Sequence, residues 1–242
     1  ELAASGDLPL SADLYLTPDD AEGILETGPY GEGAVKVRGI KMYMDGALGS
    51  RGAALLAPYS DARASSGLLV TPPEQIAAMI QRAKAKNVQV TTHAIGDRGN
   101  RLVLDAYRDA YADNPEALRN ARYRIEHAQI LATEDIPRFA AQGVIASMQP
   151  SHAISDLFFA PARLGPNRLA GAYAWRALLD SGATIAGGTD APVEKGDPLV
   201  EFYAATYRHD LSGFAGPDWH LEEAVTRIEA LRMFTAAPAF AS

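Results

Sequence analysis

Four residues that can bind a metal ion, or be converted to bind one, stand where a strand pattern ends. In a barrel of alternating strands and helices, side chains at the carboxyl ends of the strands converge on one mouth, so ligands far apart in sequence can meet. Neutral imidazole and carboxylate are ligands of zinc and related metals. The pattern therefore predicts a hydrolytic metal site. Its members are Lys41 in Ile40-Lys41-Met42-Tyr43, His93 in Val90-Thr91-Thr92-His93, His127 in Ile125-Glu126-His127, and Asp190 in Gly188-Thr189-Asp190.

Each of these residues also has a purely structural interpretation. A single histidine at a strand end is commonly satisfied by a backbone carbonyl, but two at equivalent places, His93 and His127, favour a shared metal ion. Asp190 could bind metal, move a proton, or cap a turn as aspartates in such loops do. Lys41 cannot ligate a cation as an ammonium; conversion to a carbamate by carbon dioxide would turn it into a bridging carboxylate.

The elements that position these residues follow a helix-then-strand rhythm. Pro72-Pro73-Glu74 opens a helical pattern that Asn87 ends, and Gly143 and Gly182 each precede another strand pattern. The strands are short and almost continuously apolar, as in a parallel sheet covered on both faces. These features predict an α/β fold of the TIM-type (β/α)8 barrel, with six of its eight strands in this chain. The expected strands are 14–16, 37–43, 88–92, 123–125, 144–148 and 184–186.

Composition limits the domain organisation and the partners. With 242 residues, 48% of them hydrophobic, one domain is expected, and 30 acidic against 22 basic residues leave no basic face for nucleic acid. The absence of cysteine excludes thiolate metal sites and a cysteine nucleophile. No apolar run is long enough to cross a membrane, and the first residues lack a signal-peptide pattern, so a cytoplasmic location and a small-molecule substrate are expected.

Longer segments around these residues resemble the amidohydrolase superfamily. Within it they are closest to the YtcJ-like, or amidohydrolase 3, branch, which is related to N-substituted formamide deformylase. The similarity runs in order through nearly the whole chain. It is carried by the segments Ile40-Lys41-Met42-Tyr43-Met44-Asp45-Gly46-Ala47-Leu48-Gly49-Ser50-Arg51, Thr92-His93-Ala94-Ile95-Gly96-Asp97-Arg98, Arg124-Ile125-Glu126-His127-Ala128-Gln129, Met148-Gln149-Pro150-Ser151-His152 and Gly188-Thr189-Asp190-Ala191-Pro192.

The resemblance implies a metal-dependent hydrolase with one or two divalent ions, of which zinc is expected. Lys41 would be the carbamylated bridge on the fourth strand, and His93 and His127, on the fifth and sixth, would hold the second metal. Asp190, on the eighth, would bind the first metal and shuttle the proton. The sequence departs from the family in lacking the His-x-His pair of the first strand. Residues 1–242 are therefore expected to be a partial barrel domain carrying strands three to eight, inactive alone and either unstable or a homo-oligomer.

Three further residues are candidates for substrate binding. His152 follows the expected strand 144–148 and either contacts substrate or bonds to local backbone. Arg98 and Arg51 stand in loops at the expected mouth, where each would hold a substrate carboxylate or form a loop-fixing ion pair.

The leading hypothesis is a hydrolase of carbon–nitrogen bonds in an amide, formamide or cyclic amide. The alternative is a non-catalytic or regulatory barrel fragment that keeps the pocket but turns nothing over. A third possibility, a sugar- or phosphate-binding barrel, would need a glycine-rich phosphate loop after the seventh or eighth strand. Gly187-Gly188 is too little to support one.

Overall fold

The computed structural model describes residues 5–6, 8–216 and 219–242, and its centre is one parallel β-sheet. Six strands lie side by side in chain order, β1-β2-β3-β4-β5-β6, and every neighbouring pair is parallel. All six strands expected from the sequence are present, with ends that differ by up to two residues. They are β1 (Ala12–Leu16), β2 (Val35–Tyr43), β3 (Gln89–Ala94), β4 (Arg124–His127), β5 (Ile145–Met148) and β6 (Ile185–Gly187).

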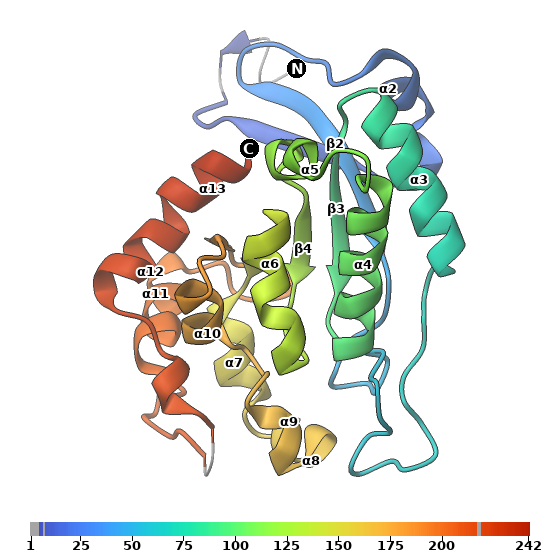
Figure 1. The fold of residues 1–242 in the computed structure, drawn as a ribbon. Coiled ribbons are helices and arrows are strands. Elements are labelled where there is room, and N and C mark those ends of the chain that lie inside the picture. The colour runs from blue at the N-terminus through green and yellow to red at the C-terminus, as the bar shows by residue number, and fades with distance from the viewer. Residues whose placement is uncertain (1–4, 7, 217–218) are drawn as a thin grey trace.

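Helices connect the strands and cover one side of the sheet. Figure 1 shows α3, α4 and α6 on the same side of β2, β3 and β4. Local sequence explains their limits: Pro73 begins α3 where no amide partner is needed, and Gly143 follows α6 with φ of 70°. The helices are η1 (Pro18–Asp20), α2 (Glu22–Thr27), α3 (Pro73–Ala85), α4 (Asp97–Ala110), α5 (Pro115–Ala121), η2 (Thr133–Asp135), α6 (Ile136–Gln142), α7 (Pro150–Asp156), α8 (Ala160–Leu164), α9 (Pro166–Leu169), α10 (Trp175–Asp180), α11 (Pro198–Tyr207), η3 (Leu221–Glu223), α12 (Arg227–Phe234) and α13 (Ala236–Ala241).

The two faces of the sheet differ in chemistry. Paired residues of parallel strands project to the same face, and alternate residues along a strand project to opposite faces. Tyr43 pairs with His93, His93 with Glu126, and Glu126 with Ser147, so one face carries a row of polar side chains near the carboxyl ends. The opposite face carries buried apolar residues that pack against the helices, such as Ile40 and Val90. The polar side chains that could take part in a reaction therefore lie on one face of the sheet, and the other face forms part of the hydrophobic core.

This arrangement matches the expected fold class. Sequential parallel strands joined by helices form a curled sheet of the TIM-barrel type, and their carboxyl ends lie together at the lower edge in Figure 1. Among the described residues, no helix is both long enough and apolar enough to cross a membrane.

Candidate metal and hydrolytic site

A cavity of about 520 Å³ opens at the carboxyl ends of the strands. The imidazole rings of His93 and His127 lie edge to face with centroids 4.6 Å apart, and the ring of His152 lies 5.7 Å from that of His127. Of the residues expected at the site, five line this one cavity: Lys41, His93, His127, His152 and Asp190. The other lining residues are Tyr43, Ala47, Leu48, Gly49, Ile95, Gln129, Asp156, Phe159, Val193 and Glu194.

His93, near the end of β3, presents a free ring nitrogen. Its Nε2 is buried and has no hydrogen-bond partner, with Asp45 Oδ1 3.6 Å away. Burial, followed by the nearby charges of His127 and Lys41, lowers the pKa of His93 to about 3. The imidazole is therefore neutral at physiological pH and can offer a lone pair to an electrophile.

His127 reaches the cavity because its backbone leaves the extended conformation. It pairs with Ala94, so strand alternation alone would direct it away from the face that carries His93 and Glu126. Its φ is 78° instead of the usual value near −120°, which swings Cβ to the other side of the incoming strand. Burial, and next the charge of Lys41, lower the pKa of His127 to about 4, so this ring is neutral as well.

Lys41 enters the same cavity from β2. Its Nζ lies 5.4 Å from the centre of the Tyr43 ring. Burial lowers the pKa of the Lys41 amine, although the negative charges of Glu126 and Asp190 oppose that shift. A lowered pKa increases the fraction of neutral amine, which is the form that reacts with carbon dioxide.

The side chains of the cavity are of types that bind a divalent metal ion, but with Lys41 unmodified they do not form a complete set of ligands. Among the described residues, no group of three His, Cys, Asp or Glu side chains is arranged to hold a metal ion. His93 and His127 nevertheless supply two neutral imidazoles, and the unpartnered Nε2 of His93 is a buried polar atom that a ligand would satisfy. Conversion of Lys41 to a carbamate would add the missing carboxylate oxygen beside them.

Asp190 and His152 lie close to each other in the same cavity. Asp190 follows β6 with φ of 54°, and its Oδ2 lies 3.8 Å from Nε2 of His152. That imidazole nitrogen is also 4.0 Å from Oε1 of Glu194 and has no hydrogen-bond partner. The side chain of Asp190 is partly exposed to the cavity, where it can exchange a proton with a bound molecule.

Two acidic residues that lie beside His93 and Lys41 had no role assigned from the sequence. Asp45 is buried behind His93 and accepts hydrogen bonds from the backbone N–H groups of Ala54 (2.8 Å), Ile95 (2.9 Å) and Gly96 (2.8 Å), which joins the segments that follow β2 and β3. Burial raises the pKa of Asp45 to about 6, against the effect of these bonds. The only feature of the sequence that could have indicated this role is the position of Asp45 just after the end of a strand.

Glu126 is the second such acid and lies on the polar face beside Lys41. It accepts hydrogen bonds from Thr91 and, at 3.2 Å, from Nε of Arg124. Burial alone would raise the pKa of Glu126, but the charges of Arg124 and Lys41 outweigh it and hold that pKa below its usual range. Glu126 therefore keeps a negative charge close to the Lys41 amine.

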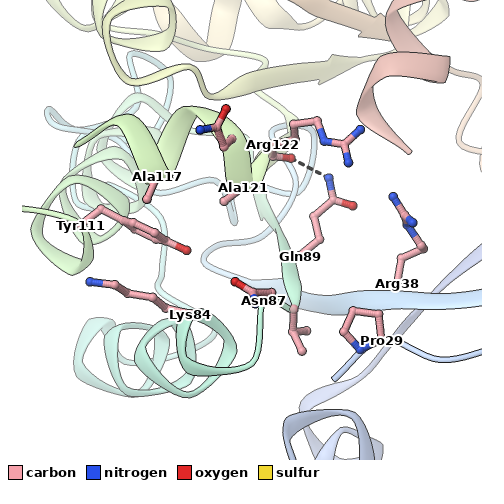
Figure 2. A pocket seen from close by; sticks show the side chains of 11 residues that line it. Pro29, Arg38, Lys84, Asn87, Gln89, Tyr111, Ala117, Ala121 and Arg122 are labelled. Atoms are coloured by element: carbon pink, nitrogen blue, oxygen red, sulfur yellow. Dashed lines mark hydrogen bonds between the residues drawn. The ribbon is translucent and has the colours of Figure 1, made fainter. Parts of the chain in front are cut away.

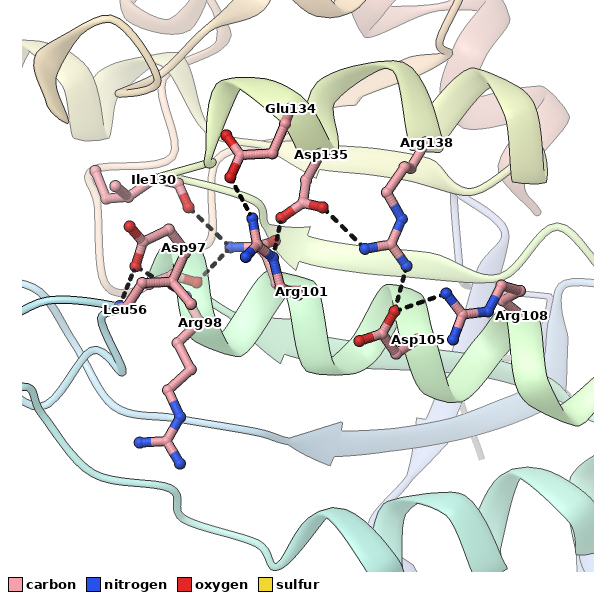
Figure 3. Close-up of polar contacts among 12 residues, drawn as sticks. Leu56, Asp97, Arg98, Arg101, Asp105, Arg108, Ile130, Glu134, Asp135 and Arg138 are labelled. Carbon is pink, nitrogen blue, oxygen red and sulfur yellow. Dashed lines mark hydrogen bonds and ion pairs between the residues drawn. The ribbon is translucent and has the colours of Figure 1, made fainter.

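The two arginines expected at the mouth do not line the cavity. Arg51 is engaged by Asp61, with Nε–Oδ1 and Nη2–Oδ2 distances of 3.1 Å, and Arg163 binds the same carboxylate. This is the loop-fixing ion pair that the sequence left as the alternative. Arg98 is exposed on the first turn of α4 and points away from the neighbouring ion pairs of Arg101 in Figure 3. A loop position at a strand end does not determine the direction of a long side chain.

A second hollow, of about 470 Å³, lies at the amino ends of the strands (Figure 2). Arg38, Lys84 and Arg122 line it. The Lys84 ammonium donates to the Ala110 carbonyl (2.8 Å) and to Asp113 (2.7 Å). Ala110 ends α4, so the Lys84 cation stabilises a free carbonyl group at a helix C-terminus. Arg122 likewise donates to the carbonyls of Phe240 and Ser242, and Arg38 pairs with Asp13, so these positive charges have structural partners.

The fold and the site together define a curled parallel α/β sheet of the TIM-barrel type with a candidate metal-binding pocket at the carboxyl ends of its strands. The chain belongs to the amidohydrolase family, whose model matches residues 1–242. It is 35% identical over 214 residues to YtcJ of Bacillus subtilis, which is named an amidohydrolase, covering 88% of this chain and 39% of that protein.

Two further proteins extend the comparison. N-substituted formamide deformylase of Arthrobacter pascens is 29% identical over 163 residues, which is 66% of this chain and 29% of that enzyme. The crystal structure of an uncharacterized metal-dependent hydrolase from Pyrococcus horikoshii superposes with a TM-score of 0.88 at 29% identity, over 99% of this chain and 48% of that one. The chain thus spans less than half the length of these relatives.

Proposed function

We propose that this chain forms part of a metal-dependent hydrolase that cleaves carbon–nitrogen bonds in amides, formamides or cyclic amides. One observation carries the proposal: two neutral imidazoles, His93 and His127, face each other at 4.6 Å in a cavity that also holds Lys41. Membership of the amidohydrolase family and similarity to a protein named a metal-dependent hydrolase support it. We also propose that β1 to β6 correspond to strands three to eight of a complete barrel.

In this proposal His93 and His127 would hold a divalent ion, with zinc preferred, and Lys41 would join them as a carbamate. Asp190 would supply a carboxylate to a first metal position. Such an ion lowers the pKa of bound water and polarises the carbonyl of the scissile bond. Asp190 would take a proton from the attacking water and return it to the leaving nitrogen; its partly exposed carboxylate in the cavity supports this role.

The remaining walls suit a small, partly apolar substrate. Leu48, Ile95 and Val193 line the cavity beside the aromatic ring of Phe159, and they would contact the substituents of the amide. His152 also lines the cavity, and its Nε2 has no protein hydrogen-bond partner, which supports a contact with the substrate. Arg51 and Arg98 do not line the cavity, so we do not propose them as substrate ligands.

The test is hydrolysis of a panel of N-formyl and N-acyl amines by this chain and by a version extended upstream, each loaded with zinc in bicarbonate buffer. Release of amine that disappears on chelation and in an Asp190→Asn variant is expected for the active form. Turnover that is unaffected by chelation would refute a metal-dependent reaction. Zinc-loaded protein that releases no amine from any member of the panel would favour the non-catalytic alternative.

A further inference from the structure

Gln149 joins the end of β5 to α7 and is held in place on both sides. Its side chain is buried, with 7% of the residue exposed. Its backbone carbonyl accepts a hydrogen bond from the His152 amide (3.1 Å), and Pro150 begins the helix directly after it. The backbone of Gln149 is therefore fixed by the start of α7, which limits the directions available to the amide group.

The amide group of Gln149 contacts the candidate metal ligand His127. Its Nε2 donates to the Ser147 carbonyl (3.4 Å), and its Oε1 lies 2.8 Å from Nδ1 of His127. Because Nε2 faces the Ser147 carbonyl, Oε1 is the atom directed at the imidazole. A carbonyl oxygen can only accept a hydrogen bond, so Nδ1 of His127 carries the ring proton. The other ring nitrogen, Nε2, is then left with a free lone pair.

We infer that Gln149 is a positioning residue that selects the Nδ1–H tautomer of His127, so that Nε2 is the atom offered to a metal ion. The inference rests on the proposed function, since it assumes that His127 is a ligand. The need for such a partner follows from the backbone: with φ of 78° at His127, the ring has left the ordinary strand geometry, and the bond to Gln149 fixes its orientation. Partners of this kind in metal sites typically change metal affinity about 10- to 100-fold when removed.

The experiment compares three variants of this chain with the wild type. Gln149→Met keeps the length of the side chain but removes the acceptor, whereas Gln149→Glu keeps an acceptor at the same place. Gln129→Met is the matched control, because Gln129 lines the same cavity but bonds to Asp156 and Tyr173 instead of His127. Two quantities are measured for each: the His127 tautomer in metal-free protein, from ¹⁵N-resolved long-range NMR of the imidazoles at neutral pH, and zinc affinity, by competition with a chromophoric chelator.

The wild type, Gln149→Glu and Gln129→Met are expected to show the Nδ1–H tautomer of His127. Gln149→Met should show a mixture of tautomers and bind zinc about 10- to 100-fold more weakly than the wild type. Circular dichroism confirms that each variant is folded. An Nε2–H tautomer in the wild type, or an unchanged tautomer in Gln149→Met, would overturn the inference. Failure of the wild type to bind zinc would contradict the proposed function, and the tautomers would still decide the role of Gln149.

Discussion

Asp45 offers a direct test of how the site is supported. It is buried, with 1% of the residue exposed, and its carboxylate accepts three backbone hydrogen bonds that join the segment after β2 to the segment after β3. Asp45→Ala would leave three buried N–H groups without acceptors, at about 1–3 kcal/mol each. It would also remove the net cost of keeping this group ionised: a pKa raised from 3.8 to about 6, the balance of burial against these hydrogen bonds, corresponds to about 3 kcal/mol at neutral pH.

With about 2 kcal/mol for each N–H group, the difference between these two effects predicts that Asp45→Ala destabilises the metal-free protein by about 3 kcal/mol at pH 7. Asp45→Asn also removes the charge, and its one oxygen can retain the two bonds that Oδ2 makes to Ala54 and Gly96, so a smaller loss than for Asp45→Ala is expected. The assay is urea unfolding followed by circular dichroism, with m-values checked for constancy. An Asp45→Ala protein within about 0.5 kcal/mol of the wild type would refute the structural role of this carboxylate.

Three further predictions concern the site and its surroundings. With zinc and bicarbonate, Lys41→Ala should lose bound metal while Lys41→Glu retains part of it; equal zinc content in wild type and Lys41→Ala, by atomic absorption, would exclude the carbamate. His93 has a pKa of about 3 in the folded protein and 6.5 in the unfolded chain. Its contribution to the free energy of unfolding is therefore fully present above pH 6.5 and is lost as the pH falls towards 3. His93→Asn should therefore reduce the slope of unfolding free energy against pH, measured between pH 4 and 6 without metal, by about 1 kcal/mol per pH unit; an unchanged slope would contradict this. Arg208 is buried and donates to three backbone carbonyls at 2.8–2.9 Å, so Arg208→Met should cost about 3 kcal/mol in urea unfolding, and a loss below about 1 kcal/mol would show that these bonds contribute little.

The sequence by itself determined the order and type of the elements that build the site. Short apolar runs, helix-opening prolines and helix-ending glycines act through neighbours in the chain, so they could be interpreted without knowledge of distant contacts. The same reasoning placed Lys41, His93, His127 and Asp190 at carboxyl ends of parallel strands, which meet at one edge of a sheet. The structure brings these side chains into one cavity with His152.

Only the tertiary structure decided how the side chains at that edge are directed. His127 reaches the cavity through a positive φ that strand alternation does not predict, and its partner Gln149 comes from another strand end. Asp45 joins two segments that are about 50 residues apart in the sequence, as its bond to Gly96 shows. Arg51 forms an ion pair with Asp61 and does not line the cavity. In each case, contacts with residues distant in the chain set the loop conformation and the direction of the side chain, and no local pattern of residue types encodes them.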